Sequence, residues 1–190
     1  MSISSQQQSM EEAKLTFQAG LSFAPDDHLL LTSLGRIYVD HEEKNEIVAR
    51  NCLALAAQEY GYCMKANLAL GRMMLSNRRP RASLRRFDRV LDWLQDRDIN
   101  IDDKRNHDVW EPYRSMGYDA RYYGAQAALI SAREAKKRLE SSGNNDDQST
   151  FEWRKHVQIA VERCNIALRS TQDDSRLHGM LSFAENLLQN

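Results

Sequence analysis

The chain contains 190 residues with 26 basic and 27 acidic side chains, so its formal net charge is -1. A chain this close to neutral is not expected to be a dedicated nucleic-acid binder. Its three prolines and eight glycines are too few for the many tight turns of an all-β fold, and we expect an all-α fold. No stretch approaches the ~18 apolar residues of a membrane span, and the N-terminus lacks the features of a signal peptide. We therefore expect a soluble, cytoplasmic protein with no membrane association.

The first predicted helical hairpin follows a polar tail over residues 1–10, which is expected to be disordered. In "LTSLGRIYVD", four residues have the spacing that places side chains on one helix face, namely Leu31, Leu34, Gly35 and Tyr38. A glycine inside a helix costs ~1 kcal/mol relative to alanine, so Gly35 predicts that a second helix packs closely over it. That second helix follows "DHEEKNE" and has small or apolar residues on one face, at Ala49, Cys52, Leu53, Ala56 and Ala57.

The same pattern recurs further along the chain. Leu-Gly-Arg occurs at residues 34–36 and again at residues 70–72. The second occurrence belongs to a predicted helix with Leu70, Gly71 and Met74 on its packing face. The helix-breaking "SNRRP" follows, and the next helix has Ser83, Phe87 and Val90 on its packing face. The sequence therefore predicts two successive helical hairpins.

These alternating Leu-Gly-x-x-Tyr and Ala-x-x-x-Phe-x-x-Ala helices resemble the tetratricopeptide repeat (TPR). The resemblance implies a single all-α domain over residues 11–190. Its architecture would be an antiparallel helix-hairpin solenoid, a TPR-like superhelix, with about three and a half repeats. Residues 11–24 would supply half a repeat, since they have the spacing of the family's second helix at Ala13, Phe17 and Gly20, followed by Pro25.

A third unit and a C-terminal cap extend the resemblance. The first helix of this unit would run from about Pro112 to Leu139, with Tyr123 and Gly124 in place of the Leu-Gly pair. A polar insertion over residues 141–150 would precede the second helix, which carries Ala160, Cys164 and Ala167 on its packing face. The last segment is expected to be a capping helix that starts at Asp174 or Ser175 and packs through Leu177, Leu181, Ala184 and Leu188.

In TPR proteins the first helices line a concave groove that commonly holds an extended peptide or a partner helix. Carried over by position, the expected groove residues here are Leu29, Thr32, Arg36, Val39, Lys65, Leu68, Arg72, Leu75, Tyr118, Arg121, Ala125 and Ala128. The four cations among them would suit a partner segment in which acidic and hydrophobic residues alternate. Pairing of these cations with the acidic stretch of residues 40–46 is the alternative. The carboxylate-clamp type of groove is not expected, because Asn67 falls on the packing side of its helix.

An arginine cluster over residues 78–89 is the most distinctive local feature. On a helix beginning near Pro80, Arg81, Arg85 and Arg89 form an outward ridge at i, i+4 and i+8. Three interpretations remain open: a solvated face paired with Asp88 and Asp92, a surface for an acidic protein, or a nucleic-acid surface. Nucleic acid ranks last, since no aromatic residues alternate with the arginines as stacking platforms.

Neither a cofactor nor a metal is expected. His41 and Glu42 begin a zinc-protease pattern, but Asn45 occupies the second histidine position. Residues 98–103 begin like a calcium-binding loop, but the residues needed to complete the loop are missing. The three cysteines are expected to be small buried hydrophobes. The sequence thus favours a non-enzymatic protein-binding module, such as an adaptor, chaperone or assembly subunit. A nucleic-acid-associated helical protein is the alternative, and homodimerisation through the N-terminal half repeat is open.

Overall fold

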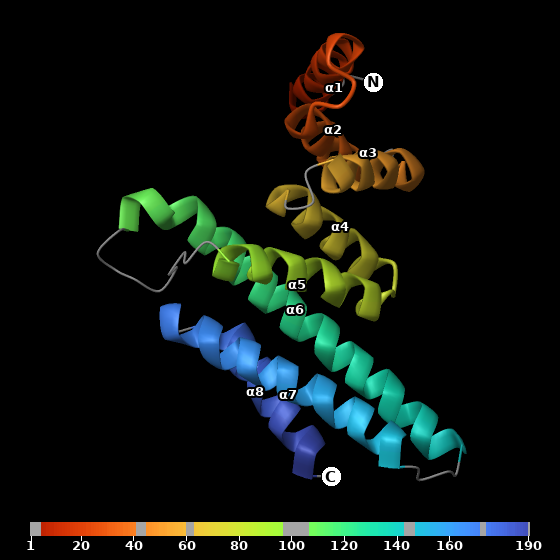
Figure 1. Cartoon of the computed structure of the whole chain (residues 1–190), viewed down its shortest axis with the longest axis vertical. Helices are drawn as coiled ribbons and strands as arrows, with labels where there is room; N and C mark the ends of the chain where they lie inside the picture. The colour runs from red at the N-terminus through yellow and green to blue at the C-terminus, as the bar shows by residue number, and fades with distance from the viewer. Residues whose placement is uncertain are drawn as a thin grey trace.

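The computed structural model describes residues 5–40, 45–59, 63–96, 107–142, 147–171 and 174–189, which form eight α-helices and contain no strand (Figure 1). The helices are α1 (Ser5–Phe23), α2 (His28–Asp40), α3 (Glu46–Glu59), α4 (Met64–Ser76), α5 (Pro80–Asp96), α6 (His107–Ser142), α7 (Asp147–Ser170) and α8 (Ser175–Gln189). The all-α prediction is confirmed for this part of the chain.

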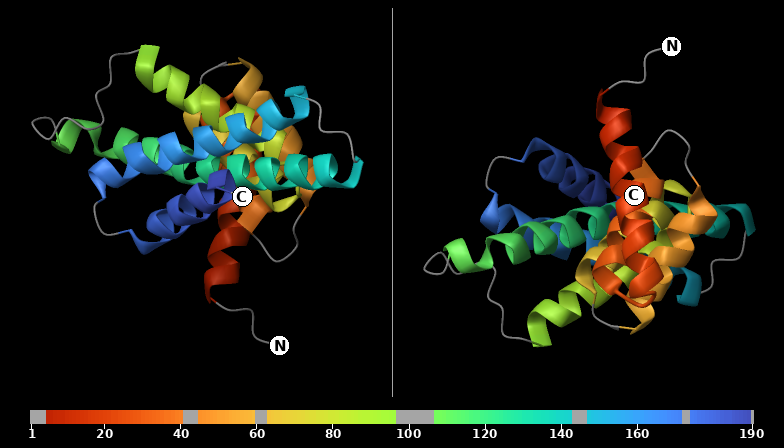
Figure 2. Two further views of the ribbon diagram at one scale, coloured as in Figure 1. Left: turned by 90° about the horizontal axis from the view of Figure 1, so that it is seen from below. Right: turned by 90° about the horizontal axis from the view of Figure 1, so that it is seen from above.

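Successive helices pack against each other along the chain. The hairpins are α2 with α3, α4 with α5, and α6 with α7. In addition, α2 contacts α4, α4 contacts α6, and α6 contacts α8, so these four helices form one continuous row. The two termini lie at opposite ends of the molecule in Figure 1. Figure 2, viewed along the long axis, shows α1 running across the direction of α6 and α7, so the elements rotate from one end to the other.

The two helices of each hairpin approach each other closely at a glycine. A Cβ atom on Gly35 would lie 2.6 Å from Cγ of Leu53 in α3, and one on Gly71 would lie 2.6 Å from a ring carbon of Phe87 in α5. Such distances are shorter than any ordinary Cβ contact, so these helices can pack this closely only where no side chain intervenes. The prediction that a second helix packs closely over Gly35 is confirmed. In the third hairpin, Gly124 faces the Arg163 guanidinium of α7 in the same way.

The buried side chains form two clusters that meet at α4. The first cluster joins α2, α3 and α4 through residues such as Leu31, Leu53 and Leu70. The second joins α4 to α8 and includes Phe87 and Leu177, both of which are fully buried. Because α4 contributes to both clusters, the core of the described residues consists of a smaller and a larger cluster that adjoin at this helix.

The turn between α4 and α5 contains a strained residue. Arg78 has φ 56°, a left-handed conformation that costs a residue with a side chain roughly 1–2 kcal/mol. The turn ends α4 with two hydrogen bonds, from Arg78 N–H to the Leu75 carbonyl at 3.1 Å and from Arg79 N–H to the Met74 carbonyl at 2.9 Å. This is the Schellman pattern, in which glycine usually occupies the left-handed position.

Asp174 fixes the start of α8 against α6. Its Oδ1 accepts hydrogen bonds from the backbone N–H groups of Arg176 at 2.9 Å and Leu177 at 3.4 Å, which confirms Asp174 as a helix cap. The hydroxyl of Tyr118 in α6 donates to Oδ2 of the same carboxylate. Hydrogen bonds from Arg176 and then Tyr118 hold the pKa of Asp174 well below its usual range. Burial, with the Asp174 hydrogen bond as the second cause, raises the pKa of Tyr118 to about 12.

Two predicted boundaries need correction. Helix α1 begins at Ser5, so residues 5–10 are helical and not a disordered tail, because this glutamine-rich stretch contains neither glycine nor proline. Residues 1–4 lie outside the described residues. The predicted insertion over residues 141–150 is also too long: α6 continues to Ser142 and α7 begins at Asp147. The helix-breaking residues of that stretch, at positions 143–145, lie outside the described residues.

Candidate functional site

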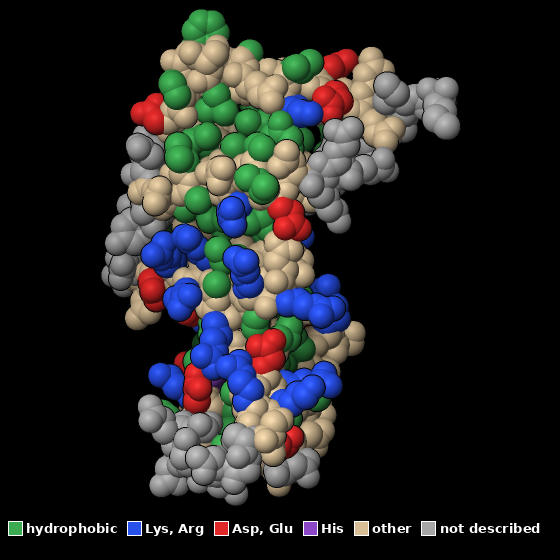
Figure 3. All heavy atoms as spheres, turned by 90° about the vertical axis from the view of Figure 1, so that its right-hand side faces the viewer, with side chains coloured by type: hydrophobic (Ala, Val, Ile, Leu, Met, Phe, Trp, Pro, Cys, Tyr) green, Lys and Arg blue, Asp and Glu red, His purple; other side chains and the backbone are tan. Residues whose placement is uncertain are grey.

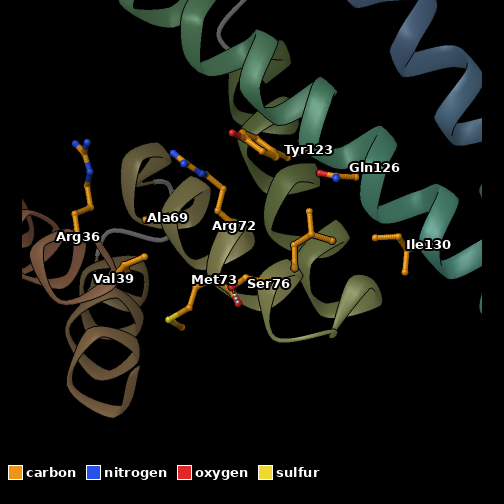
Figure 4. Close-up of a pocket in the computed structure, with 10 residues that line it drawn as sticks. Arg36, Val39, Ala69, Arg72, Met73, Ser76, Tyr123, Gln126 and Ile130 are labelled. Carbon is orange, nitrogen blue, oxygen red and sulfur yellow. Dashed lines mark hydrogen bonds between the residues drawn. The ribbon is translucent and has the colours of Figure 1, made fainter. Parts of the chain in front are cut away.

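A pocket of about 460 Å³ opens between α2, α4 and α6 (Figure 4). Its lining residues are Arg36, Val39, Ala69, Arg72, Met73, Leu75, Ser76, Tyr123, Gln126 and Ile130. Each of the three helices belongs to a different hairpin, so the pocket exists only because the hairpins pack side by side. Cationic, polar and apolar side chains all reach it, and a ligand that presents both charge and hydrocarbon would fit this lining.

Four of the twelve predicted groove residues line this pocket: Arg36, Val39, Arg72 and Leu75. The other eight do not. In α2, Leu29 is exposed and Thr32 is buried, and both lie outside the lining. Leu68 is buried at 8% exposure in the cluster that joins α4 to α8, because α6 packs against α4 and covers it. Lys65 is exposed near the start of α4 and Arg121 is half-buried on α6, and neither is among the lining residues. Of the four cations predicted for the groove, Arg36 and Arg72 therefore line the pocket and Lys65 and Arg121 do not.

The α6 residues of the pocket were not predicted. The carry-over from the TPR resemblance placed Tyr118, Ala125 and Ala128 in the groove, yet both alanines are fully buried and Tyr118 contacts Asp174. Tyr123, Gln126 and Ile130 line the pocket instead. Their i, i+3, i+7 spacing identifies a helix face, but choosing that face requires knowing where α8 packs on α6. The signal in the sequence was an isoleucine, Ile130, that follows an alanine-rich stretch.

Arg72 is held in place by aromatic stacking. Its guanidinium carbon lies 5.1 Å from the centroid of the Tyr123 ring, within the range of a cation–π contact. Tyr123 in turn stacks on Phe87, with ring centroids 6.1 Å apart, and Phe87 occupies the space over Gly71. The missing side chain at Gly71 thus determines where Phe87 lies, and Phe87 supports the ring that orients Arg72.

The charge of the two pocket arginines is only partly compensated by the described residues. Asp119 of α6 lies close enough for Arg72 to influence it: burial raises the pKa of its carboxyl, and the Arg72 charge opposes that rise. Arg36 is exposed and has no ion pair with any residue that the structure describes. Part of the acidic stretch proposed as its internal partner, residues 41–44, lies outside the described residues. Figure 4 shows both guanidinium groups extending to the same side of the drawn residues.

Asn67 is on the packing side of α4, as predicted. It is 1% exposed, and its Nδ2 donates to the Cys63 carbonyl at 3.0 Å. Its Oδ1 accepts a hydrogen bond from Nη1 of Arg86 at 3.2 Å. The amide is thus buried and engaged inside the molecule through both its nitrogen and its oxygen, which does not suit a carboxylate clamp.

The arginine ridge of α5 differs in part from its prediction. Arg81 pairs with Glu152 of α7, at 2.7 Å between Nη2 and Oε1. Asp88, expected to neutralise the ridge, instead pairs with Arg163 of α7. Arg85 and Arg89 are exposed and form no ion pair within the described ranges. The half-buried Arg86 between them has a pKa lowered first by burial and then by the charges of Arg89 and Arg85.

The described residues contain no group of three or more His, Cys, Asp or Glu side chains placed to hold a metal ion. The stretches that begin like zinc and calcium motifs, at residues 41–44 and 98–103, lie outside these residues. All three cysteines are free thiols; Cys164 is buried, whereas Cys52 and Cys63 are only half-buried, against expectation. Among the described helices, none has the length and apolar character needed to cross a bilayer.

Comparisons with protein-family models, with curated proteins and with solved structures find no match to this chain. The pocket between α2, α4 and α6 and the charged surfaces beside it are therefore the features from which a function can be inferred.

Proposed function

We propose that this chain is a cytoplasmic, non-enzymatic protein-binding module, acting as an adaptor, chaperone or assembly subunit. In this proposal the hairpins form a TPR-like solenoid of about three and a half repeats, with α1 as the half repeat and α8 as the cap. A segment of the partner protein lies in the pocket between α2, α4 and α6.

One observation carries the proposal: two arginines reach an open pocket that also has an apolar lining. Arg36 and Arg72 offer forked donors that suit carboxylates, while Val39, Leu75 and Ile130 offer apolar contacts. Neither arginine has an ion-pair partner within 4.0 Å among the described residues. A partner segment with an acidic side chain next to an aliphatic one would satisfy both parts of the lining, in the manner of a peptide or helix held in a groove.

Photo-cross-linking from inside the pocket tests the proposal. Ile130 lines the pocket and is 36% exposed, whereas Leu55 on α3 is 45% exposed and lies outside the lining. A benzophenone amino acid at position 130 should capture a discrete partner in cells that make the protein, and the same residue at position 55 should not. The cross-linked segment, made as a peptide, should bind the purified chain, and replacing its acidic residue by asparagine should weaken binding.

Charge reversal links that capture to the two arginines. Arg36→Glu with Arg72→Glu should reduce the adduct more than tenfold, since each charge-assisted hydrogen bond contributes about 1.5–3 kcal/mol. Arg50→Glu with Arg89→Glu is the matched control, because both residues are exposed on helices outside the lining and the net charge changes equally. Circular dichroism confirms that both variants fold. Undiminished adducts from a folded Arg36, Arg72 variant would rule out the pocket as the binding site.

A further inference from the structure

A second charged region lies where the α4–α5 turn, the C-terminal part of α6 and the start of α7 meet. Figure 3 faces the right-hand side of Figure 1 and shows Lys and Arg side chains gathered over the middle and lower parts of the molecule, with a smaller number of acidic side chains scattered among them. We call this region the basic surface, and its cations are Arg78, Arg79, Arg81, Arg85, Arg133, Lys136, Lys137, Arg138, Arg154 and Lys155. The same segments contain four acidic residues, Glu134, Glu140, Asp147 and Glu152, and Glu46 of α3 lines a small pocket together with Arg79.

Two side-chain contacts show that these three segments adjoin one another. The ion pair of Arg81 with Glu152 links the start of α5 to the start of α7. Trp153 links α7 to α6, since Nζ of Lys136 lies 5.2 Å from its ring centroid. Folding therefore adds the cations of α6 and α7 to the arginine cluster of residues 78–89. The local positive charge is therefore larger than that of the arginine cluster by itself.

The acidic residues neutralise little of this charge. Glu152 is used by Arg81, and Glu134 pairs with Arg138 at 3.8 Å between Oε2 and Nη2. Seven exposed cations of the basic surface have no ion pair within the described residues, and these are Arg78, Arg79, Arg85, Arg133, Lys137, Arg154 and Lys155. So many like charges on one surface repel one another, and a bound polyanion would remove that repulsion.

We infer that the basic surface binds the phosphate backbone of a nucleic-acid duplex without reading its sequence. Phosphate contacts require positive charge and forked donors but no apolar anchor, and seven of the ten cations are arginines. A protein interface or a membrane surface would be expected to place large apolar side chains among the cations. The described part of these segments exposes a single large hydrophobic side chain, Phe151, which is fewer than such an interface would be expected to have. The pocket that we propose for a protein segment has a different lining, so this second activity does not depend on the first.

Fluorescence anisotropy with a labelled duplex of about 20 base pairs and arbitrary sequence tests the inference. If the surface contacts about five phosphates, the affinity should fall about 500-fold between 50 and 200 mM salt, because the logarithm of the affinity decreases by about 0.9 per phosphate for each tenfold rise in salt. Arg133→Glu with Lys137→Glu should weaken binding at 50 mM salt. With two contacts fewer, the same salt step should reduce the affinity only about 40-fold.

The matched control is Lys65→Glu with Arg169→Glu, because these substitutions change the net charge equally and both residues are exposed and lie outside the basic surface and the pocket lining. It should bind the duplex as the unmodified chain does. Absence of binding at 50 mM salt, or equal weakening by both double variants, would overturn the inference. Tighter binding to phosphatidylserine vesicles or to polyglutamate than to the duplex would also overturn it, and would assign the surface to a membrane or to an acidic protein. None of these results would alter the photo-cross-linking test of the pocket.

Discussion

Gly71 is the residue at which one added methyl group should disturb both the packing and the candidate pocket. A Cβ there would lie 2.6, 2.7 and 3.1 Å from three ring carbons of Phe87. Phe87 is fully buried and stacks on Tyr123, so its ring has little room to move. In Gly71→Ala the ring must shift, and the support for the Tyr123–Arg72 contact shifts with it.

Two opposing effects determine the size of the change. Forcing an extra methyl group into a well-packed core costs typically 1–3 kcal/mol, while replacing glycine by alanine in a helix gains up to about 1 kcal/mol. We expect Gly71→Ala to lower the free energy of unfolding by about 1–2 kcal/mol. Gly179 in α8 is the matched control, since it is exposed and a Cβ there would meet no atom within 4 Å. Gly179→Ala should raise the free energy of unfolding by about 0.5–1 kcal/mol.

Urea denaturation followed by circular dichroism measures both changes, and the two midpoints should move in opposite directions. In a chain that already carries Phe87→Leu, Gly71→Ala should lower the free energy of unfolding by less than it does in the unmodified chain, because the smaller side chain makes room for the methyl group. If Gly71→Ala stabilised the chain as much as Gly179→Ala, the close approach of α4 and α5 would be refuted.

Two further predictions concern a turn and a helix cap. Arg78→Gly should raise the free energy of unfolding by about 0.5–1 kcal/mol. The substitution relieves the left-handed strain at φ 56°, and the larger entropy of glycine in the unfolded chain offsets part of that gain. An unchanged urea midpoint would contradict the strained turn. Asp174→Asn should destabilise the chain at neutral pH. The pKa of Asp174 is lowered in the folded state, so the stabilisation by its charge is present above its ordinary pKa of about 3.9 and is lost as the pH falls further. The stability difference between the two proteins should shrink below about pH 4 in thermal melts, and a difference independent of pH would contradict the ionic role of the carboxylate.

Much of the fold follows from short-range signals in the sequence. The Leu-Gly pairs at 34–35 and 70–71 predict the close helix approaches that the structure has, because a glycine within a helix needs a compensating contact. The burial of Asn67 and the capping by Asp174 were likewise predicted from helix faces and terminal residues. These features depend on residues within one or two helices, which periodicity can reveal.

The candidate site was predicted less completely because it depends on contacts between hairpins. Arg36 and Arg72 both follow a Leu-Gly pair in similar helices, so the recurrence of Leu-Gly-Arg identified both. The α6 face could not be found that way, since α8 covers one side of α6 and Tyr118 is engaged by Asp174. Leu68 fits a groove position by spacing but is buried, because spacing alone does not tell a groove from a neighbouring helix.

The third hairpin differs from the first two in the residue that packs over its glycine. The residue that packs over the glycine is Leu53 in the first hairpin and Phe87 in the second, but Arg163 in the third. Arg163 is 8% exposed and pairs with Asp88 of α5, while its Nη1 has no hydrogen-bond partner among the described residues.

A buried ion pair contributes little net stability, because desolvation offsets the attraction, but it restricts how two elements can be arranged. The pair of Arg163 with Asp88 and the pair of Arg81 with Glu152 both join α5 to α7, and α7 packs on α6. The pocket takes Arg72 from the hairpin of α5 and Tyr123 from the hairpin of α7. The pair of Arg163 with Asp88, which lies outside the pocket, therefore restricts the relative placement of the side chains that line it.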